Sequence, residues 1–94
     1  MENEFKIEAV ITPLQPPRET LIAWASIIIN NSFLITGIGI HLAKEEIRIT
    51  FPAKKLASSR EKYLYFFKPL NQKIASQILE VIKREVEKSG LFKP

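Results

Sequence analysis

The spacing of the apolar residues changes once along this chain, at Pro69. Before Pro69, apolar residues alternate with polar ones or form short β-branched runs, which is typical of strands. After Pro69 they recur at helical spacing, at Ile74, Ile78, Ile82 and Val86, which predicts one amphipathic helix. Strands that are joined by short turns and followed by a helix predict an α+β fold. We expect a mainly antiparallel five-stranded sheet with the C-terminal helix packed on it.

Turn residues divide the strand region into five segments. The expected strands span residues 5–12, 21–29, 33–42, 47–51 and 62–67. Residues 13–20 predict a loop, because their three prolines cannot donate hydrogen bonds to a strand ladder. Residues 30–32 and 44–46 predict tight turns. Asn71 is the expected N-cap of the helix, and Gly90 is expected to end it.

Length and composition exclude several classes of protein. Ninety-four residues predict a single domain over 1–94, with a core at about 5–89. There is no apolar run of the roughly 18–20 residues that a membrane span needs, and the acidic first residues are unlike a signal peptide, so we expect a cytoplasmic protein. The chain has no cysteine, no aspartate, one histidine (His41) and no glycine-rich phosphate loop. We therefore expect no metal, no cofactor, no small-molecule substrate and no catalytic activity.

Positive charge is concentrated in one segment of the sequence. Residues 47–75 carry seven basic residues against one acid, Glu61, whereas residues 1–46 have a net charge of −3. Because local charge attracts a polyanion more than net charge does, this segment predicts contact with nucleic acid. The expected phosphate contacts lie in and beside the loop 52–61, at Lys54, Lys55, Arg60 and Lys62, with Ser58 and Ser59 as hydrogen-bond donors. A solvated loop is the alternative interpretation.

Further candidates flank this loop or lie on the helix. Lys73 falls in the first turn of the helix, where the macrodipole disfavours a cation by ~0.3–1 kcal/mol, so a phosphate held jointly with Lys68 would compensate. A lysine that points into solvent is an equal alternative. Among the rings of residues 63–67 we expect core packing, with Tyr63 the one available for base stacking. Arg84 and Lys88 are secondary candidates because acids lie close to them in sequence.

The strand expected at 21–29 is apolar on both faces. One face carries Ala23, Ala25, Ile27 and Ile29, and the other carries Ile22, Trp24 and Ile28. A single helix covers one face of a sheet only, and large exposed apolar patches are rare on soluble monomers. We therefore expect a homodimer that covers the second face, with Trp24 in the core or at the dimer interface.

Four blocks of the sequence together carry a family resemblance. They are AWAS at 23–26, FLITGIGI at 33–40, FPAKK at 51–55 and PLN at 69–71. In this order they resemble the SpoVG family of small bacterial regulators, and the resemblance covers about residues 5–89. It implies a dimeric protein of sheet and helix that binds DNA and RNA. It also implies a regulatory role in septation during cell division, in sporulation or in gene expression.

Two of these regions depart from the family pattern. The family block resembling MPSRK is FPAKK here, so Lys54 and Lys55 stand where the family has an arginine and a lysine. An Arg-Asp pair of the family is Leu64 and Tyr65 here. Because lysine lacks the bidentate fork of arginine, we expect backbone binding rather than a defined base sequence. The alternative function is a non-enzymatic module that docks an acidic protein partner through its sheet edge or apolar face.

Overall fold

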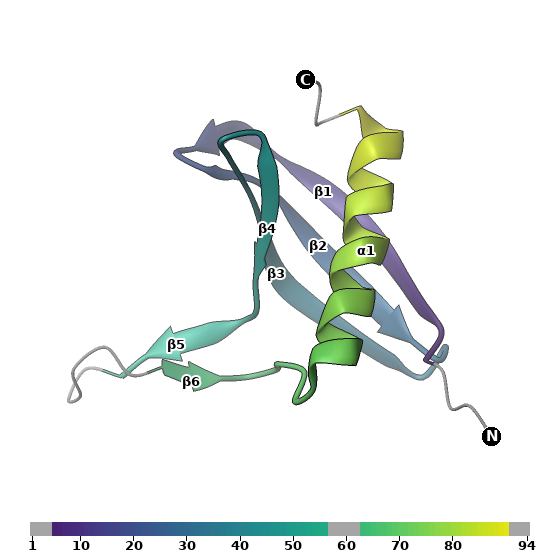
Figure 1. Cartoon of the computed structure of the whole chain (residues 1–94). Helices are drawn as coiled ribbons and strands as arrows, with labels where there is room; N and C mark the ends of the chain where they lie inside the picture. The colour runs from purple at the N-terminus through teal and green to yellow at the C-terminus, as the bar shows by residue number, and fades with distance from the viewer. Residues whose placement is uncertain (1–4, 57–62, 91–94) are drawn as a thin grey trace.

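The computed structural model describes residues 5–56 and 63–90. In this part of the chain, the elements follow in the order β1 (Ile7–Arg18), β2 (Leu21–Ile29), β3 (Phe33–Ala43), β4 (Glu46–Thr50), β5 (Ala53–Lys55), β6 (Tyr63–Tyr65) and α1 (Gln72–Ser89). Strands β1 to β4 form an antiparallel sheet in sequence order, and β5 pairs with β6 in a separate two-stranded sheet (Figure 1). The predicted α+β class is confirmed.

The single five-stranded sheet is the part of this prediction that is wrong. The segment expected to be its fifth strand forms β6, which pairs with β5 inside the expected loop. Phe51 and then Pro52 follow β4, and Pro52 has no N–H to continue the ladder. Beside it, Gly37 has a φ of 82°, and a Cβ there would lie 3.6 Å from the Cβ of Pro52. The ladder between β3 and β4 therefore ends at the Gly39–Thr50 pair, and the chain continues as a separate ribbon.

The predicted loop at 13–20 is wrong as well. Strand β1 continues through Pro13, Pro16 and Pro17 to Arg18. Within the described part of the chain β1 pairs with β2 alone, so it is an edge strand, and edge strands tolerate residues that cannot donate on their open side. The prolines do disturb the pairing, because the register of β1 with β2 shifts between Pro13 and Arg18.

Both predicted tight turns are confirmed. Asn30 and Asn31 have φ values of 52° and 54°, and Lys44 and Glu45 have φ values of 53° and 63°. Positive φ at two successive residues is the mark of the type I′ turn, whose twist matches that of antiparallel strands. These turns fix the hairpins β2–β3 and β3–β4.

The amphipathic helix packs across one face of the sheet, against β1 and β4 (Figure 1). The buried core joins both layers through Ile7, Ala23, Ala25, Ile27, Ile38, Ile40 and Ile47 of the sheet and Ile78, Ile82 and Val86 of the helix. This arrangement confirms the predicted apolar stripe.

Both predicted helix caps are present. The Asn71 side chain accepts a hydrogen bond from the backbone N–H of Ile74 at 2.9 Å, and Gly90 ends the helix with a φ of 79°. Left-handed backbone at this position favours glycine, which has no Cβ to clash. No helix in residues 5–56 and 63–90 is both long and apolar enough to cross a membrane.

We predict that Ile78→Ala lowers the free energy of unfolding by about 2–5 kcal/mol, because Ile78 is fully buried between helix and sheet and its loss leaves a cavity. Denaturant unfolding measures the change. Leu70→Ala is the matched control, since Leu70 is 92% exposed and its truncation should change stability by less than about 0.5 kcal/mol. Equal effects of the two substitutions would contradict this description of the core.

Candidate nucleic-acid interface

Strands β5 and β6 form a short ribbon that extends away from the four-stranded sheet (Figure 1). Lys54 pairs with Leu64 and Lys55 pairs with Tyr63, and all six residues of the ribbon are exposed. Cross-strand partners point to the same face, and successive residues point to opposite faces. Lys54 and Lys55 were expected in a loop, but they lie on a strand and therefore point to opposite faces of the ribbon.

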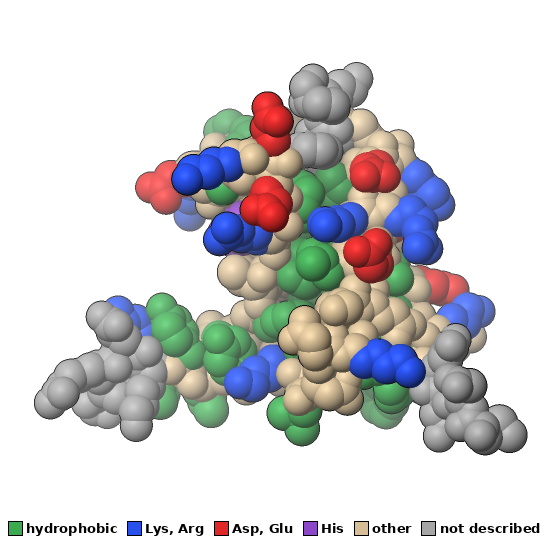
Figure 2. All heavy atoms as spheres, in the orientation of Figure 1, with side chains coloured by type: hydrophobic (Ala, Val, Ile, Leu, Met, Phe, Trp, Pro, Cys, Tyr) green, Lys and Arg blue, Asp and Glu red, His purple; other side chains and the backbone are tan. Residues whose placement is uncertain are grey.

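The surroundings of the ribbon contain cations without nearby acids. Residues 51–56 and 63–73 include no aspartate or glutamate. Over the ribbon Figure 2 shows hydrophobic and basic side chains, whereas acidic ones gather around the β3–β4 turn and beside α1. Lys54, Lys55, Lys68 and Lys73 are exposed, and none of them forms an ion pair with another described residue. Their charges are therefore available to an external anion.

Four predicted site residues, Ser58, Ser59, Arg60 and Lys62, lie outside the described residues. They belong to the segment 57–62 that joins β5 to β6 in the sequence. Their contact with nucleic acid stays a prediction.

The expectation of core packing is wrong for Tyr65 and Phe66, whereas Tyr63 is exposed, as expected of the ring available for stacking. Tyr63, Tyr65 and Phe66 are 54%, 45% and 66% exposed, and only Phe67 packs against the core, with its ring 5.8 Å from that of Phe51 in an edge-to-face contact. The physical reason is the partition of the strands, because β6 lies outside the large sheet and the helix does not cover it.

The two tyrosines lie together on one face of the ribbon. Their ring centroids are 6.5 Å apart, and the ring planes are tilted by 43°. The Lys68 ammonium lies 4.7 Å from the centroid of the Tyr65 ring, within the range of a cation–π contact. Beside them is a groove of about 320 Å³, lined by Ile49, Thr50, Phe51, Ala53, Tyr63 and Tyr65. The sequence pattern marks Tyr63 as a candidate, but it misses Tyr65 and the groove.

The helix cations have different surroundings. Lys73 lies exposed in the first turn of α1, as predicted. Lys88 forms an ion pair with Glu85 at 3.5 Å, and Arg84 is exposed on the same helix. Because acids of the helix offset these charges, Arg84 and Lys88 remain secondary candidates.

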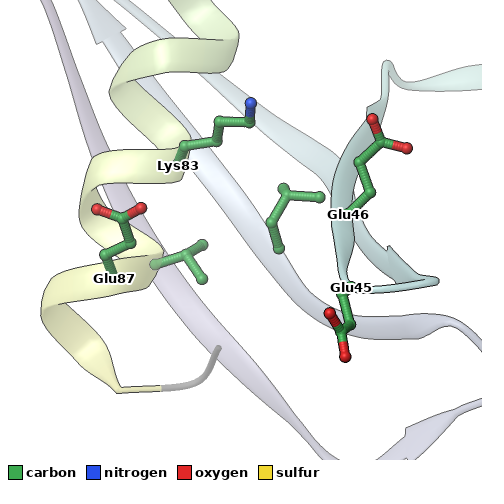
Figure 3. Close-up of a pocket in the computed structure, with 6 residues that line it drawn as sticks. Glu45, Glu46, Lys83 and Glu87 are labelled. Carbon is green, nitrogen blue, oxygen red and sulfur yellow. The ribbon is translucent and has the colours of Figure 1, made fainter. Parts of the chain in front are cut away.

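A hollow of about 190 Å³ lies between α1 and the β3–β4 turn. Lys83 and Glu87 border it from the helix, and Glu45 and Glu46 border it from the turn (Figure 3). Three carboxylates and one ammonium give it a negative charge, which repels phosphate. Across the described ranges, no group of three or more histidine, aspartate or glutamate side chains has the arrangement to hold a metal ion.

The sheet face opposite the helix, here called the far face, carries exposed apolar side chains together with polar ones such as Glu8 and Thr12. It carries Val10, Trp24 and Leu34, which are exposed, together with the half-buried Ile22 and Ile28. The expectation that Trp24 lies in the core of one chain is wrong, since it is 41% exposed. The other expected placement of Trp24, at a dimer interface, stays a prediction.

Comparisons of this chain with protein-family models, curated proteins and solved structures found no match. The SpoVG resemblance therefore stays a prediction from the residue pattern.

Proposed function

We propose that this chain is a nucleic-acid-binding regulatory protein of the cytoplasm, which holds phosphates through the cations of the β5–β6 ribbon and its junction with α1. The observation that carries the proposal is the group of four exposed lysines, Lys54, Lys55, Lys68 and Lys73, without acids among the described residues around them. A role in septation, sporulation or gene expression is what the family resemblance implies.

The expected mode of binding is contact with the phosphate backbone. Lysine ammonium groups act as point charges, and each phosphate they neutralise releases counterions. Lys54 and Lys55 point to opposite faces of the ribbon, so each face presents at least one cation. Since neither residue has the fork that reads guanine bidentately, this surface supports binding with little sequence preference.

We predict that Lys54→Ala with Lys55→Ala weakens binding and flattens its dependence on salt. For labelled duplex DNA, log K should fall against log salt by about 0.9 per phosphate contacted, and for a single strand by about 0.7. If each lysine contacts one phosphate, the slope of the double variant should be shallower by the amount that corresponds to about two phosphate contacts. Fluorescence anisotropy over a salt series measures it.

The matched control is Lys6→Ala with Lys44→Ala, which removes two exposed lysines outside the basic segment and changes the net charge equally. It should leave the slope as in the unaltered protein. If both double variants give the unaltered slope, the cations of the ribbon are not the contact and the helix cations become the better site. If the unaltered protein binds neither DNA nor RNA at low salt, the proposed function is wrong, and docking of an acidic protein partner becomes the better account.

We also propose that the protein is a homodimer in which a second copy covers the far face. The supporting observation is that the apolar side chains Val10, Trp24 and Leu34 of the far face are exposed on neighbouring strands. Burying such a face contributes roughly 25 cal/mol per Å² of apolar surface, which favours association.

We predict that Trp24→Lys shifts the protein from dimer to monomer, because a charge placed at a buried interface loses its hydration. Light scattering at micromolar concentration measures the mass. Phe33→Lys is the control, since Phe33 is also an exposed ring but pairs with Ile29 on the helix side of the sheet. An unaltered protein that is already a monomer at this concentration would contradict the proposal.

A further inference from the structure

We infer that the groove beside Tyr63 and Tyr65 is a stacking site for an unpaired base, so that single-stranded nucleic acid is preferred over duplex. The inference rests on the proposed function and specifies its ligand. It depends on the shape of the groove, on the exposure of the rings, and on the placement of the cations around them.

The groove has the size and lining of a small-ligand site. Its volume of about 320 Å³ lies at the lower end of the ~300–1,000 Å³ typical of such sites. Ile49, Phe51 and Ala53 make its lining apolar, and the two tyrosines add aromatic surface from β6. Ala53 is the cross-strand partner of Tyr65, and its small methyl side chain leaves space beside the ring. A planar, mostly apolar group fits these surroundings.

The tyrosine rings keep aromatic surface exposed, although the Lys68 ammonium lies over one face of the Tyr65 ring. Both side chains are about half exposed, and their mutual tilt means that they are not stacked flat on each other. Exposed aromatic side chains serve single-strand binders as platforms, because every base has a π-face. In a duplex each base is already stacked and paired, so a duplex does not present that face unless a base is unstacked at a free-energy cost.

Two lysines accompany the tyrosine rings and could contact the phosphates next to a stacked base. Lys55 is the cross-strand partner of Tyr63 and so lies on the tyrosine face, and the Lys68 ammonium lies over the ring of Tyr65. Lys54 points to the opposite face of the ribbon, together with Leu64. The tyrosine face therefore combines stacking surface and charge, which is the combination that single-strand binding requires.

A second copy of the chain is a less suitable cover for this groove than for the far face. Two tyrosines line the groove, and Lys55 and Lys68 lie on the same side of the ribbon, so a protein interface there would remove water from hydroxyl and ammonium groups, which is costly unless they find partners. The far face also carries Glu8, Thr12 and Ser26, the cross-strand partners of Ile28, Trp24 and Val10, but its exposed apolar side chains need no such partners.

The test compares Tyr63→Leu with Tyr65→Leu against Tyr63→Phe with Tyr65→Phe. The leucine pair keeps apolar bulk in the groove and removes the aromatic faces, whereas the phenylalanine pair keeps the faces and removes the hydroxyls. The probes are a fluorescein-labelled oligothymidine and a blunt duplex of equal length, titrated by anisotropy at one fixed low salt concentration. Phe33→Leu removes an exposed ring at the β2–β3 hairpin and is the control.

We expect the unaltered protein to bind the single strand more tightly than the duplex. The leucine pair should weaken single-strand binding by at least about fivefold, leave duplex binding unchanged, and keep the salt slope, because no charge is removed. The phenylalanine pair and Phe33→Leu should bind as the unaltered protein does. A strand with one 2-aminopurine should lose emission on binding the unaltered protein, and this quenching should disappear in the leucine pair.

The contrary outcomes separate this inference from the proposed function. If salt-dependent binding is present and the leucine pair binds the single strand as the unaltered protein does, stacking is wrong and phosphate binding stands. If the leucine pair weakens the binding of single strand and duplex equally, while the midpoint of its thermal unfolding is unchanged, the tyrosines only position the ribbon. The inference is then wrong as well. If the unaltered protein binds neither probe, both proposals fail.

Discussion

The packing of one helix on one face of the sheet is the contact on which the other features of this molecule depend. Ile78, Ile82 and Val86 are fully buried against a sheet whose second strand contributes Ala23 and Ala25 beneath them. Each buried aliphatic side chain of the helix contributes roughly 1.5–3 kcal/mol, and the helix lies against β1 and β4. One helix cannot also cover the reverse face, and it does not reach the ribbon.

Two uncovered surfaces result, and their chemistry differs. The far face presents large apolar side chains on adjacent strands, which water solvates poorly and a second protein surface covers well. The ribbon presents rings interleaved with lysines. This combination suits contact with a nucleic acid, which offers phosphates and planar bases, better than burial in a protein interface that excludes water. The difference in composition is the reason for assigning self-association to the first surface and nucleic acid to the second.

Local signals in the sequence predict much of the fold. The isoleucine stripe, the Asn71 cap and the Asn30–Asn31 turn each depend on residues within a few positions of one another, and the structure confirms all three. The partition of the strands could not be predicted in this way. It depends on Pro52 meeting Gly37, fifteen positions away, where the ladder ends. Likewise, proline predicts either a loop or an edge strand, and only the strand order shows that β1 is an edge.

The geometry of the candidate site likewise depends on contacts between residues that are far apart in the sequence. Lys54, Lys55 and Tyr63 are identified from charge and ring content, but whether a ring is buried depends on which sheet its strand joins. The hydrogen bonds of His41 could not be predicted from the sequence pattern. Its ring lies 2.9 Å from the Thr20 hydroxyl and 3.3 Å from the Thr50 hydroxyl, which are 21 and 9 positions away in the sequence. These hydrogen bonds tie the β1–β2 turn to the end of β4, just before the chain leaves for the ribbon.

The register of the ribbon determines which charges accompany which rings. Because side chains alternate along a strand, the pairing of Lys55 with Tyr63 and of Ala53 with Tyr65 places both rings, one lysine and one small residue on the same face. A slip of one residue would bring Lys54 to the tyrosine face and move Ala53 away from Tyr65. The hydrogen bond from the Phe66 N–H to the Pro52 carbonyl, at 2.9 Å, extends the ladder at its base and holds this register. Pro52 thus ends one sheet through its missing N–H and anchors the next through its carbonyl, so the same residue separates the ribbon from the body and aligns the face that we assign to the base.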